Sequence, residues 1–164
     1  MESMKKTIVV ITGTARSGKD TVAGIAGEMT GQSMTLSIVH DTLVAQEATR
    51  LGWTGNKDEE GRALLARVKD SLGNRPLEEL ARKVREIHGG LVFVQMRERA
   101  DIDSFRAMFP EAVTLLVTGR EGKRFRNHAD EKAGTGQFDV VISNTTSLQA
   151  LRAEVARFLL AANG

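Results

Sequence analysis

The 164-residue sequence contains no cysteine, only three histidines and no long apolar run. The missing cysteine excludes thiol catalysis, disulfide bonds and cysteine-ligated zinc. Three scattered histidines do not favour a zinc site built by the protein alone. The opening residues MESMKK lead into only a short apolar stretch before Gly13, which is too short for a signal peptide or a membrane span. We therefore expect a cytoplasmic protein with no membrane partner.

The sequence also lacks a strong charge of one sign. Its formal net charge of +2 is too small to indicate a nucleic-acid-binding field over the whole surface, so we expect no nucleic-acid partner. A hydrophobic content of 41% and a charged content of 27% are ordinary for a soluble globular protein. The length predicts a single domain over residues 1–164, present as a monomer or a homodimer. There is no internal repeat, low-complexity tract or linker.

Short apolar segments alternate with amphipathic ones along the chain. Strands are predicted at residues 7–12, 34–40, 91–96, 112–118 and 138–143. Helices are predicted between them and at the end of the chain, including 19–29, 41–51 capped by Asp41, and 59–72 capped by Asp58. This order predicts an α/β fold, a three-layer, doubly wound, parallel five-stranded sheet. Ligands in such sheets bind outside the carboxyl ends of the strands, where residues 13–18 must lie.

The segment GTARSGKDT, residues 13–21, joins the first strand to the first helix. Glycines at 13 and 18 let the backbone curl around a phosphate chain, and the helix start points its positive dipole end into the loop. Lys19 supplies a point charge for the phosphates. The segment therefore predicts a nucleotide-binding loop formed by Gly13, Thr14, Ala15, Arg16, Ser17, Gly18, Lys19, Asp20 and Thr21.

Asp20 occupies the position where such loops carry a magnesium-binding hydroxyl. In one interpretation Thr21 supplies that hydroxyl, and Asp20 turns aside or holds water around the metal. In the other, Asp20 is an acid in the first turn that only favours the helix. The sequence does not separate them, and both residues are candidate magnesium ligands.

GTARSGKDT resembles the loop of small P-loop kinases of the nucleoside and nucleotide kinase superfamily. The displaced threonine is similar to the GKGT of adenylate kinases, and SGKDT looks like the loop of phage-type deoxynucleoside monophosphate kinases and animal-type phosphomevalonate kinases. FDVVISNTTSLQAL, residues 138–151, is similar to a segment near the carboxyl terminus of dephospho-coenzyme A, adenylate and deoxynucleotide kinases. The resemblance implies a P-loop NTPase fold that uses ATP and Mg²⁺, with Asn144 at the start of a loop against the adenine.

TGREGKRFRNHADEK, residues 118–132, holds five basic side chains after a strand. Guanidinium groups stabilise the charge that builds up on the oxygens of a transferring phosphoryl group. The resemblance implies that residues 120–132 form a small basic lid, with Arg120 on the adenine or the phosphates and Arg124 acting in the closed state. A solvated basic helix, partly neutralised by Glu121, Asp130 and Glu131, is the alternative.

FVQMRERADIDSFR, residues 93–106, resembles a strand of deoxynucleotide and phosphomevalonate kinases that ends in an acid and an arginine. Arg97 matches the arginine and is a candidate catalytic and acceptor-binding residue. Gln95 stands at the acid's position and cannot ionise. Either the role of the acid has moved, with Asp41 as the best alternative and a plain helix cap as its other interpretation, or the familiar reaction is lost.

The acceptor site is predicted between the second and third strands, where this superfamily holds the acceptor phosphate with arginines. Asp41, Arg62 and Arg97 are the candidate acceptor-binding residues, although Arg62 judged singly also fits an ordinary surface charge. The leading hypothesis is a kinase that transfers the γ-phosphoryl group of ATP to a nucleoside monophosphate or a deoxynucleotide. The alternatives are a kinase of another small metabolite, such as dephospho-coenzyme A, and an ATP-binding module without transferase activity.

Overall fold

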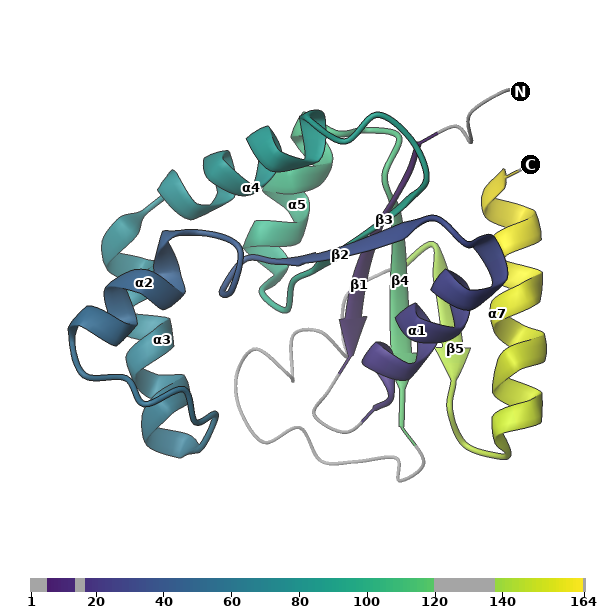
Figure 1. Cartoon of the computed structure of the whole chain (residues 1–164), viewed down its shortest axis with the longest axis horizontal. Helices are drawn as coiled ribbons and strands as arrows, with labels where there is room; N and C mark the ends of the chain where they lie inside the picture. Colours follow the sequence, from purple (N-terminus) through teal and green to yellow (C-terminus); the bar gives the residue numbers. More distant parts are fainter. Residues whose placement is uncertain (1–5, 14–16, 120–137, 164) are drawn as a thin grey trace. The chain divides into compact units, whose positions relative to one another are not determined.

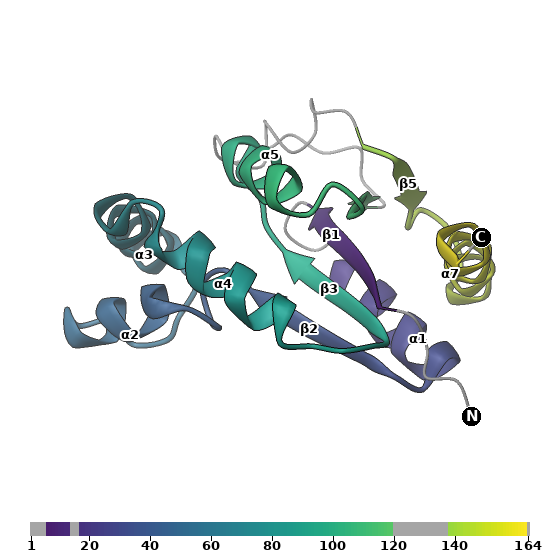
Figure 2. The same ribbon diagram turned by 90° about the horizontal axis from the view of Figure 1, so that it is seen from above.

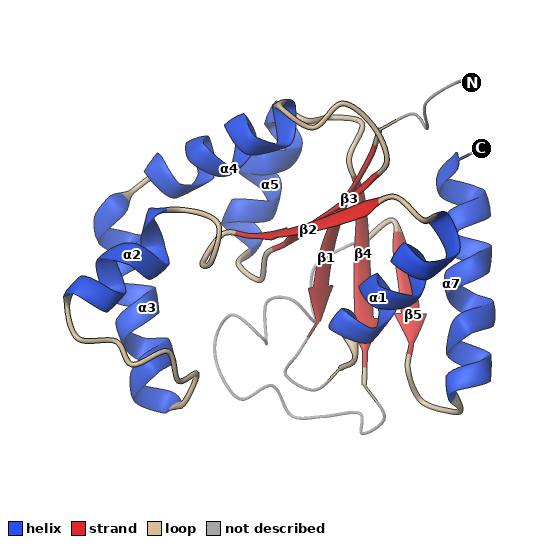
Figure 3. Ribbon diagram, in the orientation of Figure 1, coloured by secondary structure: helices blue, strands red, loops and turns tan. Residues whose placement is uncertain are grey.

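The computed structural model describes residues 6–13, 17–119 and 138–163. Its strands form one five-stranded sheet in the order β2-β3-β1-β4-β5 (Figures 1 and 3). The strands are β1 Thr7–Gly13, β2 Ser33–Ser37, β3 Leu91–Gln95, β4 Val113–Thr118 and β5 Val140–Ser143. The α/β fold class with a parallel, doubly wound sheet, predicted from the sequence, is confirmed.

Strand β1 occupies the centre of the sheet. It pairs in parallel with β3 on one side, where Ile11 lies opposite Gln95, and with β4 on the other, where Gly13 lies opposite Val117. Residues 8–13 of β1 are all buried, because helices cover both faces of the sheet. The chain therefore leaves the sheet at its middle, directly into the glycine loop.

The chain divides into two compact units, of which the first comprises residues 1–35 and 88–164. Its helices are α1 Lys19–Thr30, α5 Arg99–Met108 and α7 Leu148–Asn163. Helices α1 and α7 lie side by side on one face of the sheet, and α5 lies on the other (Figure 2). The side chains between the sheet and the α1–α7 layer form the main core, which includes Val9, Ile11, Val22, Phe93, Leu115, Ile142, Val155 and Phe158.

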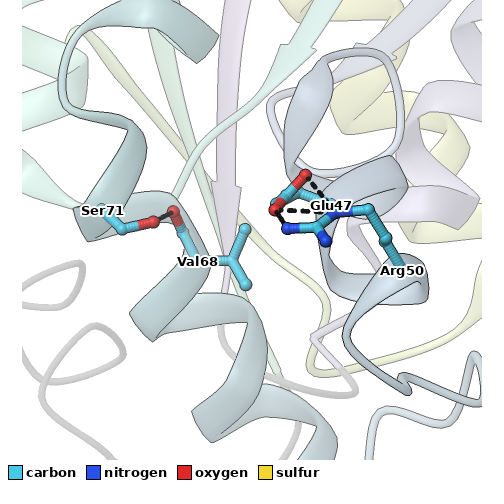
Figure 4. Close-up of polar contacts among 4 residues, drawn as sticks. All are labelled: Glu47, Arg50, Val68 and Ser71. Carbon is cyan, nitrogen blue, oxygen red and sulfur yellow. Dashed lines mark hydrogen bonds and ion pairs between the residues drawn. The ribbon is translucent and has the colours of Figure 1, made fainter.

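The second unit comprises residues 36–87 and holds helices α2 Leu43–Arg50, α3 Glu59–Leu72 and α4 Arg75–Arg85. A separate small core of Val44, Ala48, Leu65 and Val68 joins α2 to α3. Figure 4 shows two local contacts of these helices: Arg50 pairs with Glu47 on α2, and the Ser71 hydroxyl donates to the Val68 carbonyl on α3 at 2.7 Å.

The prediction of Asp58 as a cap is confirmed, because its Oδ1 accepts from the Gly61 N–H at 2.7 Å. The prediction for Asp41 is wrong. The second strand ends at Ser37 instead of residue 40, and α2 begins at Leu43 with Thr42 as its cap. The Asp41 carboxylate instead accepts from the Ser37 N–H at 2.7 Å, which closes the turn between strand and helix. The Asp41 carboxylate therefore accepts a hydrogen bond from the end of β2, and not from the first turn of α2 as the sequence suggested.

Candidate functional site

The glycine loop is closely packed where it leaves β1. A side-chain carbon added at Gly13 would stand 2.3 Å from Ser17 Oγ and 2.9 Å from the Val117 carbonyl oxygen, so only glycine fits there. Ser17 is almost completely buried, and its hydroxyl has no hydrogen-bond partner among the described residues. Ser17 thus brings a buried polar atom close to Gly13 at the end of β1.

Gly18 ends the loop and caps α1 in a left-handed conformation, with φ at 95°. Its backbone leads into Lys19, the half-buried first residue of the helix, and then into the exposed residues Asp20 and Thr21. The first N–H groups of an α-helix lack partners within the helix and carry its positive dipole end. The lysine, acid and hydroxyl of the predicted loop thus all lie in the first turn of α1.

Asn144, the residue that follows the carboxyl end of β5, contacts this loop with its side chain. Its backbone N–H donates to the Thr118 carbonyl at 2.8 Å, which fixes its position beside β4. Its side-chain Nδ2 donates to the Ser17 carbonyl at 3.1 Å. The same nitrogen would stand 2.3 Å from a side-chain carbon at Gly18, so the glycine and the amide fit each other. The resemblance implied that Asn144 begins a loop against the adenine, and the sequence gave no sign of this contact with the glycine loop.

Asp139, at the start of the same segment, anchors β5 to β4. Its Oδ2 accepts from the Thr114 N–H at 2.9 Å, and its own N–H donates to the Thr114 hydroxyl at 2.9 Å. Arg106 of α5 lies 3.7 Å from the same carboxylate oxygen. Because Thr114 is fully buried, this exchange of hydrogen bonds fixes the strand that carries Asn144. In the sequence, Asp139 directly before the apolar residues 140–142 was the feature that could have indicated this anchor.

The carboxyl end of β3 lies beside the end of β1. The buried Thr12 hydroxyl donates to the Met96 carbonyl at 2.8 Å, which holds the residues around it next to the glycine loop. Arg97 follows in the chain and is half-buried. The Gln95 Nε2 group donates to Asp20 Oδ1 at 2.8 Å. The two residues that depart from the resembled pattern are therefore in direct contact.

The remaining acceptor candidates belong to the second unit. Asp41 is half-buried in the turn before α2, and its carbonyl accepts from Lys83 Nζ at 2.6 Å. Arg62 is exposed on the first turns of α3. Beside Asp41, the pKa of His40 is lowered, mainly because partial burial disfavours its charged form and also because Lys57 repels it. No acceptor role is tested by these contacts, so both remain predictions.

Several predicted site residues lie outside the described part of the chain. These are Thr14, Ala15 and Arg16 of the glycine loop, and Arg120 and Arg124 of the predicted lid at 120–132. Within the described part, no group of three His, Cys, Asp or Glu side chains is placed to hold a metal ion. None of the described helices combines the length and the apolar character needed to cross a membrane.

No protein-family model and no curated protein matches the sequence. Solved structures do match along nearly the whole chain. Thymidylate kinase from Candida albicans matches with a TM-score of 0.60 at 11% identity, over 99% of this chain and 96% of that one. A sugar kinase from Janibacter sp. matches with a TM-score of 0.55 at 16% identity, over 96% of both chains.

Shikimate kinase from Aquifex aeolicus matches with a TM-score of 0.53 at 12% identity, over 96% of this chain and all of that one. By their names the three proteins are kinases of different acceptors, and what they share with this chain is the arrangement of the sheet and helices. The chain has the fold of the small P-loop kinases.

Proposed function

We propose that the protein is a kinase that transfers the γ-phosphoryl group of ATP to a small acceptor, a nucleoside monophosphate or a deoxynucleotide. The observation that carries the proposal is the loop between β1 and α1. It combines the close turn at Gly13, the left-handed Gly18, and Lys19 at the first position of α1. These features converge at the carboxyl end of the central strand, where open α/β sheets bind their ligands.

The residues present fit a nucleotide triphosphate. The buried Ser17 hydroxyl lacks a partner among the described residues, and the first turn of α1 offers backbone N–H groups beside it. Phosphate oxygens are strong acceptors for such donors. The ammonium group of Lys19 adds a positive charge next to them. We infer that the loop binds the phosphate chain of ATP and orients its terminal phosphoryl group.

The donor set also fits magnesium. Mg²⁺ prefers oxygen ligands and is usually bound by one or two carboxylates together with substrate phosphates. The Thr21 hydroxyl and the Asp20 carboxylate, adjacent in the first turn of α1, are the oxygen groups that would hold it, directly or through water. When bound, the ion neutralises charge on the phosphate oxygens.

Arginine side chains of the protein would bind the phosphate groups of ATP and of the acceptor. Arg97, beside the loop at the end of β3, would pair with the phosphoryl group or the acceptor phosphate, and Arg62 and Asp41 would orient the acceptor. Arg120 and Arg124 would add positive charge that stabilises the transferring phosphoryl group. Catalysis would consist of positioning and charge stabilisation, which is the main requirement of phosphoryl transfer.

A second candidate, an ATP-binding module without transferase activity, is favoured by Gln95, which supplies an amide where the resembled strand has an acid. Release of ADP, coupled to a spectroscopic assay, separates the two functions when it is measured with a panel of small acceptors. The panel should include nucleoside monophosphates, deoxynucleotides, dephospho-coenzyme A and phosphorylated metabolites. Release that depends on one acceptor supports the kinase. Tight ATP binding without release on any acceptor supports the module.

Lys19→Ala tests the site itself. We expect this variant to lose nearly all acceptor-dependent ADP release and to keep its circular dichroism spectrum, because it removes a phosphate contact from the first turn of α1. Arg152→Ala is the matched control, since it removes an equal charge from the exposed face of α7. If Lys19→Ala keeps full turnover, the assignment of the active site is wrong.

A further inference from the structure

Asp20 and Gln95 are 75 positions apart in the chain, and their side chains meet beside the glycine loop. Asp20 lies in the first turn of α1, between Lys19 and Thr21. Gln95 is the last residue of β3, opposite Ile11 of β1. The backbone around Gln95 is tied to β1 by the buried hydrogen bond from Thr12 to the Met96 carbonyl. Gln95 is therefore the half-buried last residue of a strand next to the central one, whereas Asp20 is exposed on the helix.

The Gln95 amide contacts Asp20 in a way that neither a basic nor an acidic side chain at position 95 would. The Gln95 amide donates to Oδ1 of Asp20, and no hydrogen bond within the described residues uses Oδ2. An arginine or lysine at position 95 would neutralise the carboxylate, and an acid there would compete with it for a proton. A neutral amide fixes the rotamer of the carboxylate and leaves its charge intact. The contact thus orients the Asp20 carboxylate through Oδ1, in the residue that follows Lys19.

We propose that Gln95 is a positioning residue that orients Asp20, so that Asp20 supplies the single carboxylate by which the loop holds the magnesium of bound Mg·ATP. The proposal rests on the proposed function and deepens it. It separates the two interpretations of Asp20 that the sequence left open, and it accounts for the amide at position 95. The absence of an acid on β3 is then no loss of function, because the carboxylate is carried by α1.

The pair is suited to substitution because its hydrogen bond lies at the surface, between the exposed Asp20 and the half-buried Gln95. Removing a hydrogen bond at the surface leaves no buried polar atom unsatisfied, so the variants are expected to fold. Asp20→Asn removes the charge with almost no change of shape, and Gln95→Leu removes the amide. The double variant Asp20→Asn/Gln95→Glu exchanges carboxylate and amide between the two positions. It preserves the hydrogen bond, the net charge and the side-chain sizes.

The measurement is the dissociation constant of a non-hydrolysable ATP analogue with and without Mg²⁺, by titration calorimetry. The ratio of the two constants, which we call the magnesium gain, reports the metal contact without requiring turnover. We expect Asp20→Asn to lower the magnesium gain about tenfold or more, and Gln95→Leu to lower it by about tenfold, the lower end of what loss of a ligand-orienting partner costs. The double variant should stay as low as Asp20→Asn, because its carboxylate lies on β3 instead of α1. Glu28→Gln, which removes an acid farther along α1, should leave it unchanged.

A merely structural role predicts a different pattern. In that case the substitutions would shift the melting temperature and leave the magnesium gain at the wild-type value, which would overturn the proposal. A double variant that recovers the gain would overturn the assignment of the magnesium ligand to Asp20, and an unaltered gain in Gln95→Leu would overturn the positioning role of Gln95. If the wild-type protein does not bind the analogue at all, the proposed function fails and this inference fails with it. Normal binding with an unaltered gain in Asp20→Asn overturns the inference alone.

Discussion

At the scale of single residues, the site is held together by side chains that touch the loop backbone. Asn144 is the clearest example, because its amide donates to the Ser17 carbonyl while its own backbone N–H is fixed by Thr118. Gly18 leaves just enough room for that amide. The contact joins the residue after β5 to Ser17, just before α1, and so ties the loop backbone to the sheet.

Asn144→Ala is expected to weaken binding of Mg·ATP about fivefold. The variant loses one side-chain hydrogen bond to the backbone of Ser17, next to the left-handed Gly18, and one such bond contributes about 1 kcal/mol. Inorganic tripolyphosphate should lose the same factor, because the defect lies in the phosphate loop. Competition binding against a fluorescent nucleotide measures both ligands. Thr145→Ala, an exposed neighbour, is the control.

The two roles of Asn144 give opposite outcomes in this assay. If the side chain contacts adenine, as the sequence resemblance implied, binding of ATP weakens while binding of tripolyphosphate does not change. A loss confined to ATP would therefore contradict the role in anchoring the loop. An equal loss for both ligands would support it.

At the scale of elements, α3 is specified by local signals. Asp58 caps its first turn, Glu59 and Glu60 lie where the dipole favours acids, and Gly73 follows its last residue. All of these signals lie within the helix and its flanks, so the sequence alone predicted both of its ends. Its buried side chains, Leu65 and Val68, then form the small core with α2.

Asp58→Ala is expected to destabilise the second unit by about 1 kcal/mol, because the Gly61 N–H loses its acceptor. For a chain of this length the melting temperature should fall by about 2–4 °C. Asp58→Asn, which keeps an acceptor oxygen, should recover most of the loss. Glu59→Ala removes an equal charge from the same turn without touching the cap. If Glu59→Ala costs as much as Asp58→Ala, the effect is the helix dipole and not the cap.

The start of α2 shows where prediction from the sequence fails. Asp41 and Thr42 are adjacent, and either side chain can cap a helix. The structure uses Thr42, because the Asp41 carboxylate accepts from Ser37 in the preceding turn. The contact of Gln95 with Asp20 could not be predicted from the sequence either, because it requires β1 and β3 to be neighbours in the sheet. Local patterns therefore predicted the elements and one cap, whereas contacts between distant segments required the structure.

At the scale of the whole molecule, the chain has more than one hydrophobic core. The main core lies between the sheet and the α1–α7 layer, and a smaller one joins α2 to α3. The sequence predicted one domain from length alone, and length does not report how buried side chains are grouped. Segments with separate cores often open as separate cooperative units within one domain. The second unit, residues 36–87, is the candidate for such a separate opening.

Leu65→Ala, followed by native-state hydrogen exchange, tests whether residues 36–87 open separately from the rest of the chain. Leu65 is 7% exposed in the small core, and truncating such a side chain costs about 2–5 kcal/mol, in part through the cavity that remains. We expect faster amide exchange throughout α2, α3 and α4 and unchanged exchange in β1 and β4. Val155→Ala, in the main core, is the reciprocal variant and should accelerate exchange in α1, α7 and the sheet. If Leu65→Ala instead accelerates exchange in β1 and β4 as much as in α3, the 164 residues unfold as one cooperative domain, because only global unfolding exposes all of these amides together.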